Sequence, residues 1–181
     1  MLHIKVPITA EKWDEENREF IEPEYKTLQL EHSLVSLSKW ESKWNKAFLS
    51  KTDKTLEETL DYIKCMTLTQ NVSPDIYDKL TNENVDQIQK YINAPMTATT
   101  FYEQKTNGSK KETITSEVIY YWMIALNIPF ECQKWHLNRL LTLIRVCEIK
   151  NTPPKKMNKR DIMSRNAALN AARRKQFNTR G

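Results

Sequence analysis

The sequence predicts a mainly α fold: a compact helical domain with a small N-terminal β-hairpin, a β-hairpin excursion near residue 108 and a basic C-terminal arm. Glycine is scarce, because Gly108 and Gly181 are the only two in 181 residues. Folds that need many tight turns or glycine-lined phosphate loops are therefore disfavoured. Apolar residues make up 39% and charged residues 28% of the chain, a balance typical of a globular protein. A chain of this length fits one domain with appendages.

Two short segments near the N-terminus alternate between apolar and polar residues. Leu2 to Val6 is typical of a half-buried strand that ends at Pro7, and Thr27 to Glu31 alternates in the same way. We expect the two to pair as a hairpin that lies against helices, since a two-stranded element alone is only marginally stable. The acidic stretch from Trp13 to Pro23 between them is expected to be a loop or turn.

The first predicted helix begins after Ser33, a good capping residue, and has apolar residues at steps of three and four. They are Leu34, Leu37, Trp40, Trp44 and Phe48. This spacing places all five on one face. Core packing is the ordinary role of such a face, and a groove for a partner helix is the alternative. We take Trp40, Trp44 and Phe48 as candidate partner-binding residues.

Further helices are expected where a capping residue or a proline borders an apolar periodic segment. They run behind Thr55, behind Ser73, from Thr81 or Asn82 to Pro95, from Ser116 to Pro129, and after Pro129 through Trp135 to Cys147. The segment from Val118 to Leu126 is apolar nearly all round and is therefore expected to be central. Between these helices, Asn107-Gly108 lies within a threonine-rich stretch, which predicts the hairpin excursion.

Charge is distributed unevenly along the chain. Residues 150–181 contain ten Lys or Arg and one acid, a net charge of +9, whereas residues 1–149 contain 18 basic and 22 acidic residues, a net charge of −4. Pro153 and Pro154 oppose helix and mark a boundary. We therefore predict a helical core domain with a small β element over 1–150 and a basic, conditionally helical tail over 151–181. Its helix, from Asp161 to Gln176, would gain order on a partner.

The tail supplies the remaining candidate partner-binding residues: Arg165, Arg173, Arg174 and Lys175. Such a tail can be a solvated arm, bind an acidic protein surface, or contact phosphates without sequence specificity. Phe177 is its only aromatic residue, so recognition of single-stranded nucleic acid is not indicated. Bulky apolar residues for a membrane surface are missing, and no apolar run approaches the roughly 20 residues of a membrane-spanning helix.

No pattern of catalytic residues is present. The sequence contains no P-loop, dinucleotide fingerprint, GxSxG or HExxH motif. Cys132 and His136, four apart on a predicted helix, can present two ligands to one metal ion, but no CxxC pair or second histidine completes a set. The three cysteines lie in apolar stretches, as buried thiols in a reducing compartment do. We expect a non-enzymatic protein without metal or cofactor.

Five segments together carry a resemblance to a known group of proteins: Leu30 to Leu34, Ser38 to Trp44, Tyr120 to Ile124, Trp135 to Leu140, and Asn166 to Arg174. They resemble small tailed-bacteriophage proteins of the tail-morphogenesis region, the tail assembly chaperones, and the resemblance spans most of the chain. It implies a helical protein of the host cell cytoplasm that coats the tape measure protein before the tail tube polymerises. The aromatic residues would then be apolar anchors and the tail would fold onto acidic surface.

Two alternatives to the chaperone function remain open, and self-association of the protein is compatible with all three functions. The protein can be a virion structural component, such as a tail or connector protein, whose basic arm packs on neighbouring subunits. It can also be a nucleic-acid-binding protein that uses the tail. Presence in purified virions distinguishes a structural component from a chaperone. A steep loss of affinity for nucleic acid as salt rises identifies a nucleic-acid-binding protein.

Overall fold

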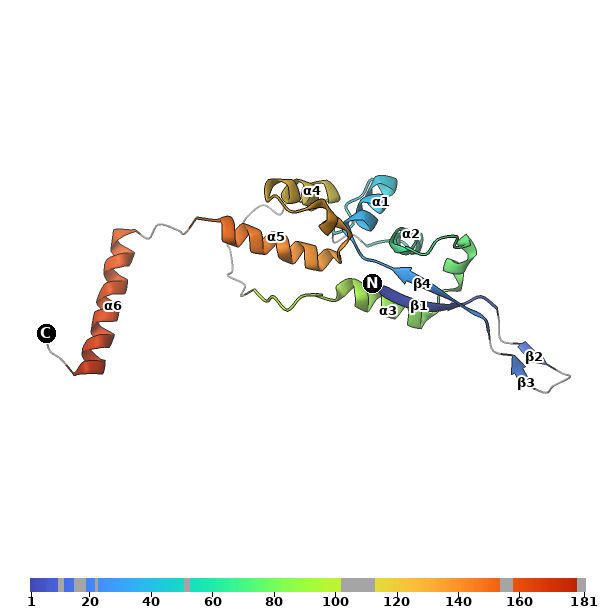
Figure 1. Cartoon of the computed structure of the whole chain (residues 1–181), viewed down its shortest axis with the longest axis horizontal. Coiled ribbons are helices and arrows are strands. Elements are labelled where there is room, and N and C mark those ends of the chain that lie inside the picture. Colours follow the sequence, from blue (N-terminus) through green and yellow to red (C-terminus); the bar gives the residue numbers. More distant parts are fainter. Residues whose placement is uncertain are drawn as a thin grey trace. The chain divides into compact units, whose positions relative to one another are not determined.

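The computed structural model describes residues 1–9, 12–14, 19–21, 23–50, 53–101, 113–153 and 158–178. The fold is mainly helical with an antiparallel N-terminal hairpin, which confirms the predicted fold class. The elements in chain order (Figure 1) are β1 (Leu2–Pro7), β2 (Lys12–Asp14), β3 (Glu19–Ile21), β4 (Tyr25–Leu30), α1 (Leu34–Trp44), α2 (Leu56–Met66), the 3₁₀ helix η1 (Pro74–Lys79), α3 (Asn82–Asn93), α4 (Ser116–Ala125), the 3₁₀ helix η2 (Phe130–Lys134), α5 (Leu137–Asn151) and α6 (Lys159–Phe177). The chain divides into two compact units, residues 1–148 and 149–181.

The N-terminal hairpin is the one the alternation predicts. β1 pairs with β4 from Leu2 opposite Leu30 at one end to Pro7 opposite Tyr25 at the other. The inward-facing side chains of both strands are buried. Between the two strands, β2 pairs with β3, and Trp13 lies opposite Phe20. The expectation of a loop or turn from Trp13 to Pro23 is therefore wrong for Trp13–Asp14 and for Glu19–Ile21, which are strands.

Two hydrophobic clusters form the core of the first unit, and α1 contributes to both. Trp40 belongs to the cluster that contains the hairpin, α2, η1 and α3, whereas Leu34 and Leu37 belong to the cluster that contains α4, η2 and α5. Ser33 caps α1 as predicted. The helix ends at Trp44 and is capped by Asn45, which has a φ of 52°, so Phe48 lies beyond the helix and not on its apolar face.

The predicted central position of the fourth α-helix is wrong. Only Ser116, Ile119 and Met123 of α4 are buried, while Tyr121 and Ile124 are 66% and 60% exposed. α4 packs against α1, which contributes side chains to both hydrophobic clusters. The apolar residues on the outer side of α4 remain at the surface.

The capping residues of the next helices lie where the sequence places them. Thr55 and Glu58 exchange side-chain and backbone hydrogen bonds at the start of α2. Pro74 begins η1, and Thr81 accepts a hydrogen bond from the backbone N–H of Asn84 at the start of α3. Each side-chain acceptor satisfies a backbone donor that has no partner inside the helix.

The last part of the first unit differs in one respect from the prediction. After Pro129 the chain forms η2 and then starts α5 at Leu137, so Cys132 and His136 do not share a helix.

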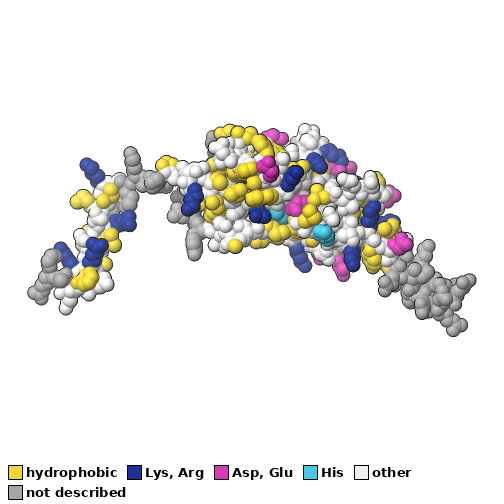
Figure 2. All heavy atoms as spheres, viewed as in Figure 1, with side chains coloured by type: hydrophobic (Ala, Val, Ile, Leu, Met, Phe, Trp, Pro, Cys, Tyr) yellow, Lys and Arg dark blue, Asp and Glu magenta, His cyan; other side chains and the backbone are white. Residues whose placement is uncertain are grey.

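In the second unit, α6 carries exposed side chains at all of its described positions (Figure 2). The predicted excursion near residue 108 lies outside the described residues. Within the described ranges, no helix is both long enough and apolar enough to span a membrane.

Candidate partner-binding groove

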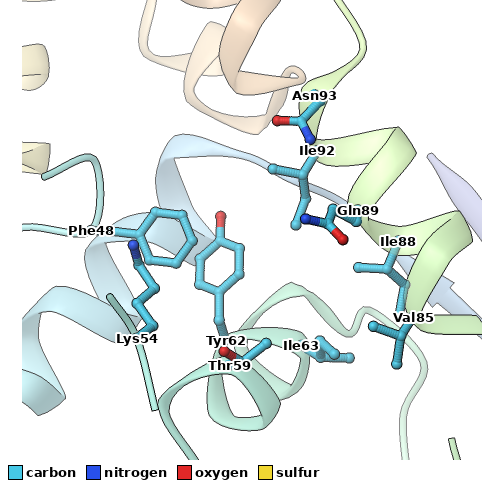
Figure 3. Close-up of a pocket in the computed structure, with 10 residues that line it drawn as sticks. All are labelled: Phe48, Lys54, Thr59, Tyr62, Ile63, Val85, Ile88, Gln89, Ile92 and Asn93. Atoms are coloured by element: carbon cyan, nitrogen blue, oxygen red, sulfur yellow. The ribbon is translucent and has the colours of Figure 1, made fainter. Parts of the chain in front are cut away.

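An apolar groove of about 260 Å³ lies between α2 and α3 and is closed at one end by the segment that follows α1. We call it the aromatic groove (Figure 3). It is lined by Phe48, Lys54, Thr59, Tyr62, Ile63, Val85, Ile88, Gln89, Ile92 and Asn93. Figure 3 shows the Phe48 and Tyr62 rings on one side and the aliphatic side chains of α3 on the other.

Helical periodicity explains the two long walls of the groove. Positions 59, 62 and 63 lie at steps of three and four on α2, and positions 85, 88, 89 and 92 do so on α3. Residues at such steps share one face of a helix. Ile63 and Ile88 are buried, whereas Val85 is 37% exposed. The bottom of the groove is therefore formed by buried aliphatic side chains, and its rim by an accessible one.

Phe48 forms part of the groove although it lies outside α1. Its ring stacks on Tyr62 with ring centroids 3.9 Å apart. Its backbone N–H donates to Glu41 Oε1 at 2.8 Å, and Glu41 Oε2 accepts from the backbone N–H of Ser116 at 2.7 Å. The buried Glu41 side chain thus ties the Phe48 segment to the start of α4.

Trp40 has a different position from the one the sequence suggested. It is 1% exposed, its indole N–H donates to the Glu58 carbonyl at 2.8 Å, and its ring meets that of Phe48 edge-on at 5.1 Å. A partner has no access to a side chain so placed, so the expectation of an accessible anchor is corrected for Trp40. The reason is that α1 is central, and its apolar face is covered by α2. Of the three aromatic candidates, only Phe48 lines the groove.

Trp44 is half-buried and is held by a charged neighbour. Its indole N–H donates to Asp61 Oδ2 at 2.9 Å, and Lys43 pairs with the other carboxylate oxygen. Burial acts to raise the pKa of Asp61, but the hydrogen bonds from Lys43 and Trp44 outweigh it and leave that pKa below its usual value. The ordered carboxylate fixes the orientation of the Trp44 ring beside Trp40.

Lys54 is the one charged residue among those that line the aromatic groove. Its ammonium lies 4.5 Å from the centroid of the Phe48 ring. Nearby, Lys46 pairs with Glu58, and this hydrogen bond together with that of the Thr55 backbone lowers the pKa of Glu58. The ammonium of Lys54 thus gives the groove a positive end. No sequence pattern identifies Lys54 or Tyr62 as lining residues, because both depend on how α2 meets the Phe48 segment.

The basic candidates of the tail, Arg165, Arg173, Arg174 and Lys175, lie on α6 and are exposed. Since successive residues of an α-helix are about 100° apart, these positions fall on different sides of the helix and do not form a single stripe. Figure 2 accordingly shows Lys and Arg side chains on more than one side of α6, with hydrophobic side chains among them.

A buried histidine pair lies where the two hydrophobic clusters meet. The rings of His32 and His136 are 5.1 Å apart, His32 Nδ1 lies 2.5 Å from the Tyr62 hydroxyl, and His136 Nε2 lies 3.0 Å from the Tyr91 carbonyl. Burial lowers the pKa of His32 to about 4, with His136 adding to the effect, and burial also lowers the pKa of His136. Both rings are therefore neutral at neutral pH, which suits a structural role in the core.

Cys65 and Cys132 show no sign of activation. Burial raises the pKa of the Cys65 and Cys132 thiols, which keeps them protonated at neutral pH and makes them poor nucleophiles. In the part of the chain that the structure describes, no three His, Cys, Asp or Glu side chains converge as metal ligands would. The arrangement supports binding through apolar contacts and charge.

Comparison with protein-family models, with curated proteins and with solved structures finds no match to this chain. The resemblance to tail assembly chaperones therefore rests on the sequence segments named above.

Proposed function

We propose that this protein is a phage tail assembly chaperone, without enzymatic activity, that binds the tape measure protein in the host cell cytoplasm during tail morphogenesis. The observation that carries the proposal is the aromatic groove, an accessible apolar surface next to the core. The sequence resemblance supplies the partner, a long helical protein that exposes apolar stripes until the tube encloses it.

The dimensions of the groove suit reversible binding to an amphipathic helix. Its volume of about 260 Å³ accommodates one or two aliphatic side chains, and burial of each contributes about 1.5–3 kcal/mol. Binding of this strength is offset in part by the entropy lost on association, so each contact is weak. A chaperone that must leave before the tube closes requires such weak contacts.

Lys54 gives the groove a preference for a partner with an acidic side chain. Its ammonium lies at the Phe48 end, where it attracts a carboxylate on the partner. A helix that inserts an aliphatic residue and has Asp or Glu three or four positions away satisfies both contacts. The preferred segment is therefore apolar on one face and acidic beside it.

The exposed cationic helix α6 supports the proposal in a second way. A polar helix without a packed face is weakly stable by itself and gains order on a partner. Its positive charge accelerates encounter with an acidic partner surface and adds specificity. In this proposal the groove provides the apolar contact and α6 the electrostatic one.

Co-expression with the tape measure protein of the same phage tests the proposal. Val85→Glu places a charge at the rim of the groove, and we expect it to abolish co-purification. Leu56→Glu is the matched control, because Leu56 is 77% exposed on α2 and does not line the groove. If Val85→Glu co-purifies with the tape measure protein as the wild type does, the groove is not the binding site and the proposal fails.

Two alternatives use the same exposed α6 and are distinguished by separate measurements. A virion structural component remains in mature particles, so its detection there by mass spectrometry would replace the chaperone assignment. A nucleic-acid-binding protein loses affinity for DNA or RNA steeply as salt rises. Tight oligonucleotide binding that Arg173→Ala/Arg174→Ala/Lys175→Ala removes would favour that function instead.

A further inference from the structure

The outer side of α4 is an apolar surface that the described part of the chain leaves uncovered. Tyr121 and Ile124 are mostly exposed, and Phe130 of η2 is exposed as well. Figure 2 shows hydrophobic side chains gathered over α4, with acidic side chains beside them. Single exposed apolar residues are ordinary, whereas a group of bulky ones marks an interaction surface. The outer side of α4 is therefore a candidate docking surface.

Helical periodicity and one hydrogen bond shape this surface. Glu117, Tyr121 and Ile124 follow one another at steps of four and three, so they share one side of α4. The Tyr120 hydroxyl donates to Gln133 Oε1 at 2.9 Å, which holds η2 next to the helix. The other side of α4 is packed in the core, and a surface carried by a packed helix loses little entropy when a partner binds. We call Glu117, Tyr121, Ile124, Phe130 and Glu131 the α4 face.

The α4 face combines its apolar residues with two carboxylates. Glu117 is the charged residue of α4, and Glu131 lies in η2. Neither takes part in the ion pairs that the described residues form. Hydrogen bonds from the backbone N–H of Glu117 itself and from the Thr115 hydroxyl lower the pKa of Glu117, so this carboxylate is charged at neutral pH. The α4 face therefore suits a partner that is both apolar and cationic.

One side of α6 has this complementary character. Two aliphatic residues and two arginines follow one another on it at steps of three, four and four, which places them on one side of the helix. They are Ile162, Arg165, Leu169 and Arg173, and all four are exposed. At 1.5 Å per residue the two arginines are about 12 Å apart along the axis, and Glu117 and Ile124 of the α4 face are about 10 Å apart. We call these four residues of α6 the α6 stripe.

Other basic residues of α6 lie away from the stripe. At about 100° per residue, Arg174 and Lys175 are roughly 120–140° around the helix from Leu169. A stripe that is docked on a second copy therefore leaves these two residues for the acidic surface of the tape measure protein. The two contacts of α6 are compatible.

The α4 face suits this helix better than it suits a nucleic acid or a membrane. Its carboxylates repel a phosphate backbone and anionic lipid headgroups, whereas they attract the guanidinium groups of the stripe. The described side chains of α6 have no packed face of their own, and a helix of that kind gains order when it packs on a partner. A second copy of the chain brings such a helix at the same concentration as the face.

We propose that α6 of one copy of the chain docks on the α4 face of a second copy. The aliphatic residues of the stripe cover Tyr121 and Ile124, and its arginines meet the two carboxylates. The contact is heterologous, because the two copies contribute different surfaces. This inference goes beyond the proposed function and is independent of it, since the α4 face shares no residue with the aromatic groove.

Sedimentation velocity of the full-length protein over a range of concentrations tests the contact. One helix covers a small area, so we expect a dissociation constant of roughly 10–100 μM, as small interfaces imply. The stripe variant is Arg165→Glu/Arg173→Glu, and the face variant is Glu117→Lys/Glu131→Lys. Each variant alone should associate about tenfold more weakly than the wild type, because like charges then meet. An equimolar mixture should regain association, because each variant then meets a surface of opposite sign.

Two further variants control for net charge and for folding. Arg174→Glu/Lys175→Glu makes the same charge change as the stripe variant on another side of α6, and it should associate as the wild type does. Tyr121→Ser/Ile124→Ser leaves the charge unchanged and should weaken association at least about tenfold, because the apolar contact is lost. Thermal unfolding of each variant, well below the concentration of association, checks that the exposed substitutions preserve the fold.

Wild-type protein that stays monomeric at concentrations well above this range would overturn the proposal, and so would a mixture that does not associate. An equal loss of association in the Arg174→Glu/Lys175→Glu control would show that overall charge and not the stripe is responsible. If the Tyr121→Ser/Ile124→Ser variant loses the tape measure protein while self-association is unchanged, the α4 face belongs to that partner and the proposal fails.

Discussion

Replacement of Trp40 tests whether this residue is part of the core or a contact for a partner. Its side chain is 1% exposed, donates a hydrogen bond to the Glu58 carbonyl at 2.8 Å, and meets the rings of Phe48 and Tyr62 edge-on. Truncation of a buried aromatic side chain to alanine costs about 3–5 kcal/mol. A domain of ordinary stability has about 5–15 kcal/mol in total, so Trp40→Ala removes a large fraction of it.

Two further variants separate the contributions to this loss. Trp40→Phe keeps an aromatic ring and loses the indole hydrogen bond, whose net contribution is about 0.5–1.5 kcal/mol, so its effect should be clearly smaller. Trp44→Ala should cost less than half as much as Trp40→Ala, since Trp44 is only half-buried. Urea unfolding followed by far-UV circular dichroism measures all three without relying on tryptophan fluorescence. A loss below about 1 kcal/mol for Trp40→Ala would refute the assignment of Trp40 to the core.

Three other predictions concern the hydrogen bonds and charges of the fold. Glu41→Ala should destabilise the first unit by about 3–5 kcal/mol in urea unfolding, because two backbone N–H groups lose a charged acceptor. Glu41→Gln keeps an acceptor and should cost less. Equal losses of stability in the two variants would contradict this. Because burial holds the pKa of His32 at about 4, well below the unfolded value of about 6.5, the unfolded chain binds more protons between these values. Stability should therefore fall by up to about 3 kcal/mol as pH drops from 6.5 to 4, and His32→Gln should flatten that profile; an unchanged slope would assign it to other groups. Deletion of residues 158–181 should leave the thermal midpoint of the first unit unchanged, because the described side chains of α6 are exposed; a clear drop in the midpoint would show that the tail packs on it.

Local signals in the sequence were sufficient for most of the helix starts and for the hairpin. Ser33, Thr55 and Thr81 cap helices by hydrogen bonds between residues three apart, and such contacts depend only on the neighbouring chain. The alternation of β1 and β4 likewise determines which side of each strand is buried. These features do not require knowledge of the tertiary fold.

The positions of Phe48 and α4 depend on tertiary contacts and were not predictable in the same way. Steps of three and four extend to Phe48, yet the helix ends at Trp44. The Phe48 ring nevertheless contacts Trp40 and Tyr62, because the Phe48 backbone N–H donates to the Glu41 carboxylate. α4 is apolar nearly all round, but which helix is central depends on how the two hydrophobic clusters share α1. Hydrophobicity alone does not distinguish a buried helix from one with an exposed apolar side.

The candidate site illustrates the same difference. Phe48 was identified from its periodicity, whereas Tyr62 and Lys54 join it only because α2 and the segment after α1 pack together. Trp40 and Phe48 have the same apolar character in the sequence, but one is enclosed and the other lines the groove. A side chain's access to a partner depends on its three-dimensional neighbours.

Site-specific photo-crosslinking in cells that produce the tape measure protein tests the central claim most directly. A photoreactive phenylalanine analogue at Val85, on the rim of the aromatic groove, should form a crosslink to the tape measure protein. The same analogue at Leu56, which is exposed on α2 but does not line the groove, should not. A crosslink from position 56 alone, or equal crosslinks from both positions, would contradict the account.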